Sequence, residues 1–423
     1  MKTGLVLSNS QATVTSFDNS EVREQTLLTP ESVAQKTTFL DWDSQPSLFK
    51  HYPHFCYRVS LRDHSSLQWL METRTITSEQ IVAHKPYYRL NVPSAGNLHP
   101  LEIYVQIRNI AGLLSGIYHL DVLTQELVLI TEIGAAGIEP YLGLDHRFSG
   151  CLVMLSIVPF RSSWKYGLRA WRYLYLDLGH QIGTLSSSVR HFGHKLTKMF
   201  TQDTDALNRV MGIGEDERIV AVYGVGERST RLVKRLEEPL MSVQPTDYTI
   251  RDALLLYNIK EVALYCEIPN STHWDDFVAL NCARRSARGF YTAAMSDTEI
   301  LELMGVKAPA SLEIVSILLQ AHTMHSGVYR NGECTVSGNF NSEIVHLLLD
   351  QRFIAGANMV LLIYSENFSA PSHIEAGMYA QELYLACEHL GVGCSGIGAF
   401  YDNEAVLWSD NPLLYAVAIG GKS

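Results

Sequence analysis

The chain has 423 residues, of which 47% are hydrophobic and 18% are charged, so it is long enough for two domains that each bury a full core. Its formal net charge of −11 argues against a nucleic acid or an anionic membrane surface as a partner, because both reward basic patches. The seven cysteines are scattered and never spaced CxxC, and no HExxH pair occurs, which argues against a disulfide framework and predicts no metal site.

Residues 1–25 are mostly polar and are expected to form an N-terminal segment outside the two domains. The apolar stretch that follows Met1 is too short for the core of a signal peptide. No uninterrupted run of about 18 apolar residues occurs, so the sequence predicts no membrane span. With its unpaired cysteines, the chain is expected in the reducing cytoplasm.

A first domain is expected over residues 26–238. Small residues at 93–97 predict a tight turn before a strand. Residues 153–157 predict a short buried strand, and a helix is expected over about 172–192. The apolar stretch 219–225 predicts a further strand, and residues 239–255 are expected to connect the two domains.

A second domain is expected over residues 256–423. Ser296 and Glu299 form a capping box that predicts a helix start. A buried strand at 360–364 precedes a helix over about 373–390, and a glycine-rich loop at 391–402 follows that helix. A last strand is expected at 413–419. Strands that alternate with helices in both halves predict α/β or α+β half-domains, and the fold class expected for the chain is α+β.

The two halves repeat each other. The segment Ser115-Gly116-Ile117-Tyr118 recurs as Ser326-Gly327-Val328-Tyr329 at an offset of 211, and the triplet that begins at Leu101 recurs at Leu312 with the same offset. Farther on, Asp177-Leu178-Gly179 matches Glu375-Ala376-Gly377 at 198, and the last strands match at 194. An offset that shrinks in steps indicates loop deletions in the second copy. A period near 200 identifies a duplicated domain.

An arginine-rich pentad, Arg284-Arg285-Ser286-Ala287-Arg288, starts the second copy. Arginine forks pair bidentately with phosphate, whereas the alternative interpretation is a solvated basic turn. The pentad resembles the RxSxR signature of nitroreductase-family domains. The resemblance implies that Arg284, Arg285, Ser286 and Arg288 bind the phosphate, ribityl chain and ring edge of flavin mononucleotide (FMN).

Two further segments resemble motifs of the same family. Pro93-Ser94-Ala95-Gly96-Asn97 is similar to its PSxxN loop, although a tight turn alone would need the same residues. The resemblance implies that all five residues bind FMN. The glycine-rich loop 391–402 resembles the family loop whose amides face flavin N5, which implies that Gly396, Ile397 and Gly398 also bind the cofactor.

The motifs are divided between the copies. At the offset of 211, Ser94 falls opposite Gly305 and Asn97 opposite Ala308, so the second copy lacks the PSxxN residues. The first copy lacks the glycine-rich loop, because His194 follows Gly193. Nitroreductases are usually homodimers with two flavins, so the resemblance implies an internal pseudo-dimer of two fused α/β/α domains with one FMN per chain.

A second RxSxR match, Arg58-Val59-Ser60-Leu61-Arg62, is interpreted as coincidence, because it lacks the other two parts of a mirror site. The chain stops at Lys422-Ser423 without a basic continuation, so phosphate binding is expected to depend on the arginines of the pentad alone.

About eight extra residues in the first copy contain the sequence KYGLRAWRY, residues 165–173. They resemble the KYGxRAxR segment of SagB-type dehydrogenases, the nitroreductase branch that oxidises azolines to azoles, and the opening segment 40–46 also resembles these tandem proteins. The resemblance implies that Lys165 or Tyr166 abstracts a proton. Either residue needs a pKa lowered by desolvation or by a nearby cation, and Arg169 and Arg172 are the cations expected to act in this way. The alternative is a solvated surface loop.

The sequence therefore predicts an FMN-dependent oxidoreductase, a SagB-type dehydrogenase or oxidase of a C–N or C–C bond in a peptide-derived or other small substrate. Oxygen or another acceptor would take the electrons. One alternative is an NAD(P)H-dependent reductase of nitro, quinone or enone compounds, and another is a degenerate partner subunit of a biosynthetic complex. The substrate and any further self-association of the chain stay open.

Overall fold

The computed structural model describes residues 20–35, 40–82, 85–201, 203–213, 216–237, 240, 264–265, 267–291 and 295–422. Apart from Leu240, the predicted connection at 239–255 lies outside these residues, as do 1–19 and the predicted start of the second domain at 256. Within the described residues the chain forms two seven-stranded sheets, one from each copy. None of the described helices is long and apolar enough to cross a bilayer.

The sheet of the first copy is antiparallel throughout. Its strands, in spatial order, are β1 (Arg58–Ser60), β6 (Glu126–Glu132), β5 (Gly116–Asp121), β4 (Leu101–Arg108), β8 (His146–Ile157), β10 (Arg218–Leu232) and β9 (Leu196–Lys198). The predicted strands at 153–157 and 219–225 lie within β8 and β10. Their side chains are buried because both faces of the sheet are covered.

The sheet of the second copy repeats this order with one strand fewer on its path. Its strands are β12 (Phe290–Tyr291), β18 (Leu413–Lys422), β16 (Met359–Tyr364), β13 (Glu313–Leu318), β14 (Gly327–Arg330) and β15 (Glu333–Ser337), and β17 (Val392–Ile397) also pairs with β18. The sequence interpretation of 391–402 as a loop is wrong for half of the segment, because β17 is fully paired along β18.

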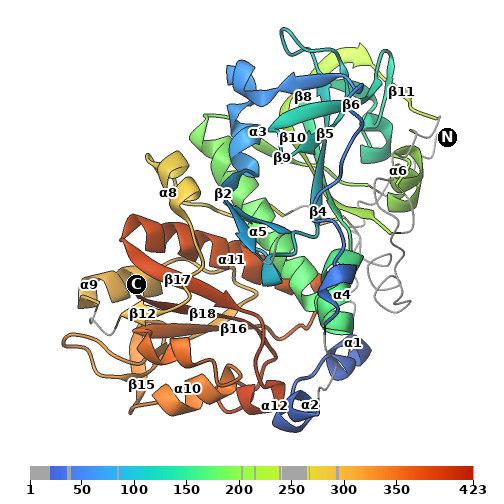
Figure 1. The fold of residues 1–423 in the computed structure, drawn as a ribbon. Helices are drawn as coiled ribbons and strands as arrows, with labels where there is room; N and C mark the ends of the chain where they lie inside the picture. Colours follow the sequence, from blue (N-terminus) through green and yellow to red (C-terminus); the bar gives the residue numbers. More distant parts are fainter. Residues whose placement is uncertain are drawn as a thin grey trace, which may run out of the picture.

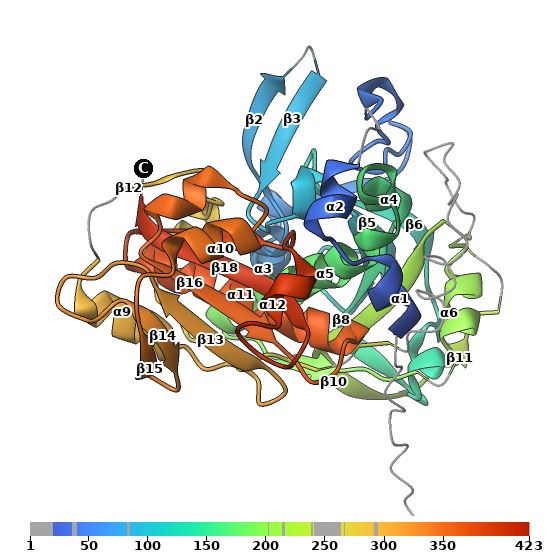
Figure 2. The same ribbon diagram turned by 90° about the horizontal axis from the view of Figure 1, so that it is seen from below.

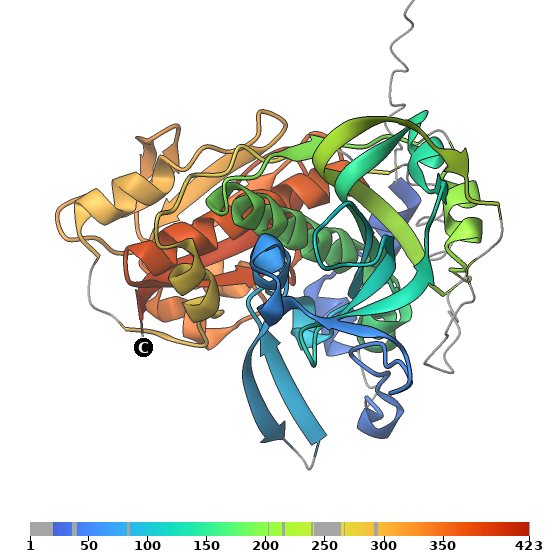
Figure 3. The ribbon, with the colours of Figure 1, turned by 90° about the horizontal axis from the view of Figure 1, so that it is seen from above.

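The long helices α5 (Ala170–His191) and α11 (Ala370–His389) pack side by side between the sheets (Figures 1 and 3). They contain the helices predicted at 172–192 and 373–390. The other described α-helices are α1 (Ser20–Gln25), α2 (Pro30–Ala34), α3 (Gln68–Thr73), α4 (Phe160–Tyr166), α6 (Thr204–Val210), α8 (Phe277–Ala283), α9 (Asp297–Met304), α10 (Asn341–Leu347) and α12 (Asp402–Ala405). The predicted capping box of Ser296 and Glu299 opens α9.

Hydrogen bonds show that the sequence repeat is a structural one. The Tyr118 hydroxyl donates to the Leu114 carbonyl and the Tyr329 hydroxyl donates to the His325 carbonyl, both at 2.8 Å. Gly193 and Gly391, which follow α5 and α11, have φ of 74° and 72°. This left-handed conformation favours glycine and ends a helix. The duplicated α+β domain is confirmed.

The segment before the first sheet joins the two copies (Figure 2). Residues 20–25, the end of the predicted polar N-terminal segment, form α1. After α1, the Leu28 amide donates to the Asp402 carboxylate at 2.9 Å. The same carboxylate accepts bonds from Arg169 at 2.9 Å and from Arg172 at 2.6 Å. A buried acid of the second copy therefore holds three donors from the first.

A two-stranded hairpin of β2 (Ile76–Val82) and β3 (Lys85–Leu90) projects from the body of the molecule (Figures 2 and 3). Its base lies where the two copies meet, because the main-chain oxygens of Leu90 and Asn91 accept bonds from Arg284 of the second copy.

Candidate active site

A cavity of about 990 Å³ lies between the two copies. All fourteen residues to which the sequence assigns cofactor binding or catalysis line this one cavity. They are Pro93, Ser94, Ala95, Gly96, Asn97, Lys165, Tyr166, Arg284, Arg285, Ser286, Arg288, Gly396, Ile397 and Gly398. Segments that lie between positions 93 and 398 of the sequence thus form a single site, with contributions from both copies.

Arg284 is the buried anchor of the arginine-rich pentad. Its side chain is 3% exposed, and it donates to the main-chain oxygens of Leu90 and Asn91 in the first copy. The guanidinium lies 5.2 Å from the centre of the Tyr384 ring, a cation–π contact. Its remaining nitrogen, Nη1, is buried without a hydrogen-bond partner among the described residues. A buried donor without a partner is costly unless a ligand satisfies it.

The rest of the pentad lies nearer the cavity mouth. Arg285 is half-buried and donates to the Thr77 carbonyl at 3.1 Å. The Ser286 hydroxyl lies 2.8 Å from the Tyr384 hydroxyl, and Arg288 is exposed. The pentad takes this extended course because α8 ends at Ala283 and Ser286 and Ala287 pair with Cys394 of β17.

The segment 93–97 forms a 3₁₀ turn at Ala95–Asn97, in which Gly96 and Asn97 both have positive φ. The side chains expected to face the flavin are bonded within the protein. The Asn97 amide donates to the Tyr88 carbonyl at 2.7 Å, and the Ser94 hydroxyl lies 2.6 Å from an Asp177 carboxylate oxygen. The turn is thus held from behind, and Gly96 is its exposed tip.

Asp177 on α5 is a site residue that the sequence did not single out. It lines the cavity although its exposure is only 4%. Burial raises its pKa to about 7, although bonds from Ser94 and the Ala95 amide and the charge of Arg74 favour the ionised form. The sequence signal was present, because Asp177 begins one of the repeated triplets. Its burial depends on tertiary structure.

Lys165 and Tyr166 occupy the last turn of the helix α4, so the alternative interpretation of a surface loop does not describe them. Both lie directly over the turn at Gly96. A Cβ on Gly96 would fall 2.3 Å from the Tyr166 hydroxyl and 3.1 Å from Lys165 Nζ. Only a glycine therefore leaves room for this pair.

The two side chains differ as candidate bases. Burial lowers the pKa of Lys165, whereas burial raises the pKa of Tyr166, and Tyr173 and Asp177 add to that rise. Of the two expected causes, desolvation lowers the pKa of Lys165, whereas Arg169 and Arg172 do not contribute to it because they pair with Asp402. The environment thus favours Lys165 as the base and keeps the Tyr166 proton in place.

The glycines at the end of β17 leave space for aromatic side chains that line the cavity. A Cβ on Gly396 would meet the Tyr415 hydroxyl at 2.0 Å, and one on Gly398 would meet the Tyr173 ring at 2.6 Å. The Gly396 amide donates to the Tyr384 hydroxyl at 2.8 Å. Close approach of backbone and rings requires glycine at both positions.

The second RxSxR match, residues 58–62, lies outside the cavity. Arg58 in β1 pairs with Asp121 at 2.9 Å and with Glu126 at 3.0 Å, and it is not among the residues that line the cavity. The pairing stabilises the edge of the first sheet, where β1 lies beside β6. Gly305 and Ala308, the positions opposite Ser94 and Asn97, lie at and just after the end of α9 and do not line the cavity either.

Comparison with known proteins decides the family. The sequence model described as "Nitroreductase family" matches residues 70–227 and 283–410, one segment in each copy and together about two thirds of the chain. The chain belongs to the nitroreductase family. It is therefore a flavin-dependent oxidoreductase, and its two fused domains form an internal pseudo-dimer.

Relatives of this nitroreductase-family chain resemble it to different extents. A protein of Methanocaldococcus jannaschii that is named as a nitroreductase is 30% identical over 92 residues, which is 21% of this chain and 46% of the relative. The chain thus matches less than half of that relative's length. A crystal structure of a nitroreductase from Anabaena variabilis covers 96% of this chain and 99% of its own, with a TM-score of 0.78 and 21% identity. This likeness shows the fold alone.

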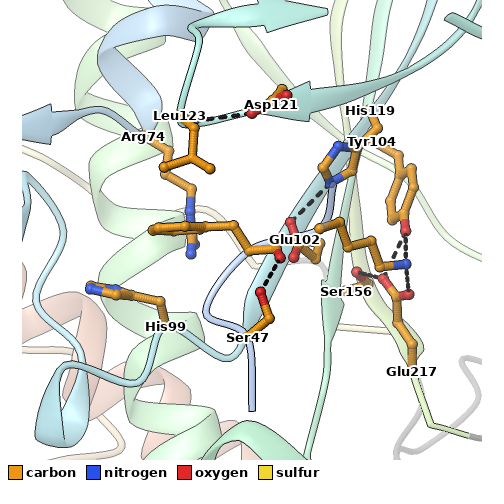
Figure 4. A network of polar contacts seen from close by, with 12 residues as sticks. Ser47, Arg74, His99, Glu102, Tyr104, His119, Asp121, Leu123, Ser156 and Glu217 are labelled. Carbon is orange, nitrogen blue, oxygen red and sulfur yellow. Dashed lines mark hydrogen bonds and ion pairs between the residues drawn. The ribbon is translucent and has the colours of Figure 1, made fainter. Parts of the chain in front are cut away.

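A buried polar network supports the first nitroreductase domain behind the cavity (Figure 4). Glu102 on β4 accepts bonds from Arg161 and from His119, the latter at 2.9 Å. Arg161 also donates to the His99 carbonyl at 3.1 Å, which ties the network to the turn at 93–97. The charges of Arg161 and His119 hold the pKa of Glu102 well below its usual range despite its burial.

Proposed function

We propose that the cavity binds one FMN per chain and that the chain is a SagB-type dehydrogenase or oxidase. Its substrate would contain a C–N or C–C bond in a peptide-derived or other small molecule. The observation that carries the proposal is the convergence of both copies on one cavity of about 990 Å³, which is at the upper end of the usual size for cofactor sites.

The residues present fit FMN. Arg284 has a buried, unpartnered nitrogen and Arg288 is exposed at the mouth, so the pentad offers charged donors to a phosphate. Gly396 and Gly398 expose backbone beside aromatic rings, which suits a flat ring system. When bound, FMN would supply the acceptor for two electrons and pass them on to oxygen or another acceptor.

Lys165 and Tyr166 support electron flow from the substrate to FMN, as in a dehydrogenase. A dehydrogenase must remove a proton from its substrate, and Lys165 is a half-buried amine whose pKa is lowered by burial. Tyr166 keeps its proton and is suited to donate a hydrogen bond to the substrate. Lys165 would hold the abstracted proton at Nζ until it is exchanged with solvent.

The first test is the amount of flavin released per chain by denaturation of the purified protein. About one FMN per chain supports the proposal. About two FMN per chain would require a second, mirror-image site, and Arg58 and Arg62 would then become candidate phosphate ligands. A protein without flavin that binds none when it is added would favour the degenerate partner subunit. Rapid anaerobic bleaching by NADH or NADPH would favour the reductase.

A further inference from the structure

Asp177 and Ser94 share a short hydrogen bond at the cavity wall. One oxygen of the Asp177 carboxylate lies 2.6 Å from Ser94 Oγ, and the other accepts the Ala95 amide at 3.0 Å. Ser94 Oγ also accepts the His99 amide at 3.0 Å. Both residues line the cavity, and Ser94 is the more exposed of the two.

This geometry permits two arrangements of protons. A serine hydroxyl has one hydrogen and two lone pairs, and His99 occupies one of those pairs. When Asp177 is ionised, the Ser94 hydrogen must point inward to the carboxylate, and Ser94 offers only a lone pair to the cavity. When Asp177 is protonated, the acid donates to Ser94 Oγ, and the Ser94 hydrogen is released toward the cavity.

The groups around Asp177 bring the two arrangements close in free energy. Arg74, which follows α3, favours the ionised form, and so do the bonds from Ser94 and Ala95. Burial on α5 opposes them, and the hydroxyls of Tyr166 on α4 and Tyr415 on β18 face the same acid. The resulting pKa of about 7 means that both forms are populated near neutral pH.

We propose that Asp177 is a positioning residue whose protonation state decides whether the Ser94 hydroxyl donates a hydrogen bond into the cavity or accepts one from it. The proposal rests on the proposed function, because bound FMN would be the group that receives the bond. Protonated Asp177 would then give tighter FMN binding than ionised Asp177.

The second copy offers a matched control. Glu375 occupies the position of Asp177 in the repeat, and it accepts a hydrogen bond from Ser311, as Asp177 does from Ser94. Neither Ser311 nor Glu375 is among the residues that line the cavity. Glu375→Gln therefore removes an equivalent carboxylate from the equivalent helix without touching the site.

The ligand-free test is the infrared band of the protonated carboxyl group, followed between pH 5 and 9. We expect a band that titrates near neutral pH, is absent in Asp177→Asn and persists in Glu375→Gln. Ser94→Ala should move its midpoint to higher pH, because the carboxylate loses a donor. A wild-type protein without such a band, or a midpoint that Ser94→Ala leaves unchanged, would overturn the proposal.

The second test compares the FMN dissociation constants of the wild type and Asp177→Asn across the same pH range. The ratio of the wild-type dissociation constant to that of the variant cancels the titration of the FMN phosphate. Asparagine donates to Ser94 permanently, so the ratio should be about 1 at pH 6 and rise about five- to tenfold by pH 8.5. The ratio of the wild-type dissociation constant to that of Glu375→Gln should not change with pH.

Two outcomes separate the possible failures. A ratio for Asp177→Asn that is equally far from 1 at every pH would show a merely structural residue and overturn the inference. A wild type that shows the infrared titration but binds no FMN at any pH would overturn the proposed function, and with it the cavity-side role of Ser94.

Discussion

Gly179 on α5 lies directly against Gly377 on α11. A Cβ on Gly179 would fall 2.8 Å from the Gly377 Cα, and a Cβ on Gly377 would fall 3.0 Å from the Gly179 Cα. Such reciprocal contacts are expected where equivalent residues meet across a twofold axis. The two glycines are also equivalent in the sequence repeat, so this helix crossing marks the local pseudo-twofold axis between the copies.

Gly179→Ala is expected to destabilise the whole chain. The added Cβ would lie 2.1 Å from the Ile374 carbonyl, a backbone atom that cannot rotate away, so the two long helices must separate. Overpacking of this kind typically costs about 1–3 kcal/mol. Urea unfolding measures the loss. Gly134→Ala is the control, because Gly134 is exposed with nothing near its Cβ, and equal losses in both variants would refute this account.

Arg288→Ala should weaken FMN binding without loss of the fold. Arg288 is exposed, and the one hydrogen bond it makes among the described residues, to the Tyr87 hydroxyl, is long at 3.4 Å, so its removal leaves little unsatisfied in the protein. A charge-assisted bond of about 1.5–3 kcal/mol corresponds to a roughly ten- to hundredfold larger dissociation constant. Quenching of flavin fluorescence measures it.

Arg62→Ala is the matched control for that variant, since Arg62 ends the look-alike pentad outside the cavity. It should leave the dissociation constant unchanged. If Arg62→Ala and Arg288→Ala weakened binding alike, the assignment of the phosphate to the second-copy pentad would be wrong.

Lys165→Ala is expected to retain FMN but to lower turnover by roughly 10²–10⁴, the usual share of general-base catalysis. Wild-type rates with a slow donor found by screening should rise with pH, because the neutral amine is the base. The midpoint should lie below the ordinary value for lysine, since burial lowers the pKa of Lys165. The alanine variant should lack this rise.

Tyr166→Phe separates the two residues of the pair. It should keep the pH dependence that Lys165 provides, because the Tyr166 proton is held by burial. If Tyr166→Phe abolished the rise while Lys165→Ala kept it, the assignment of the base would have to be exchanged between them.

Asp177→Asn should change how stability depends on pH. The pKa of Asp177 is about 7 in the folded chain and near 4 in an unfolded one, so between these values the folded state holds a proton that the unfolded state has lost. Wild-type stability therefore falls as pH rises from about 4 to 7, by up to about 4 kcal/mol. The asparagine variant lacks this pH-dependent contribution to the free energy of unfolding.

Urea unfolding of both proteins at several pH values between 5 and 8 provides the check. The advantage of Asp177→Asn over the wild type should grow with pH. A difference that stays constant across this range would mean that the Asp177 carboxyl does not titrate there.

The fold was largely predictable because the repeat preserves the residues that define each element. Tyr118 and Tyr329 are equivalent in the sequence repeat because the residues before them match, and they make the same hydrogen bond. The family motifs likewise predicted which segments would meet. That they line one cavity is now a fact of the geometry, whereas their roles toward FMN stay predictions.

Other features depend on contacts between distant segments. Arg169 and Arg172 follow Lys165 closely in sequence, yet both form ion pairs with Asp402 of the other copy. The glycine content of 391–402 suggested a loop, but pairing with β18 makes half of it a strand. Asp177 resembles any polar residue of a helix until its burial is known, because burial is what raises its pKa.

The Ser94–Asp177 and Ser311–Glu375 pairs also bear on how such a site can evolve. In a dimer of identical subunits, a mutation in one gene alters both active sites at once. Here the two pairs are encoded by separate stretches of one gene, so each can accept mutations independently. Fusion thus allows the Ser94–Asp177 pair to specialise at the cavity, whereas the Ser311–Glu375 pair, which does not line it, can diverge under selection for folding alone.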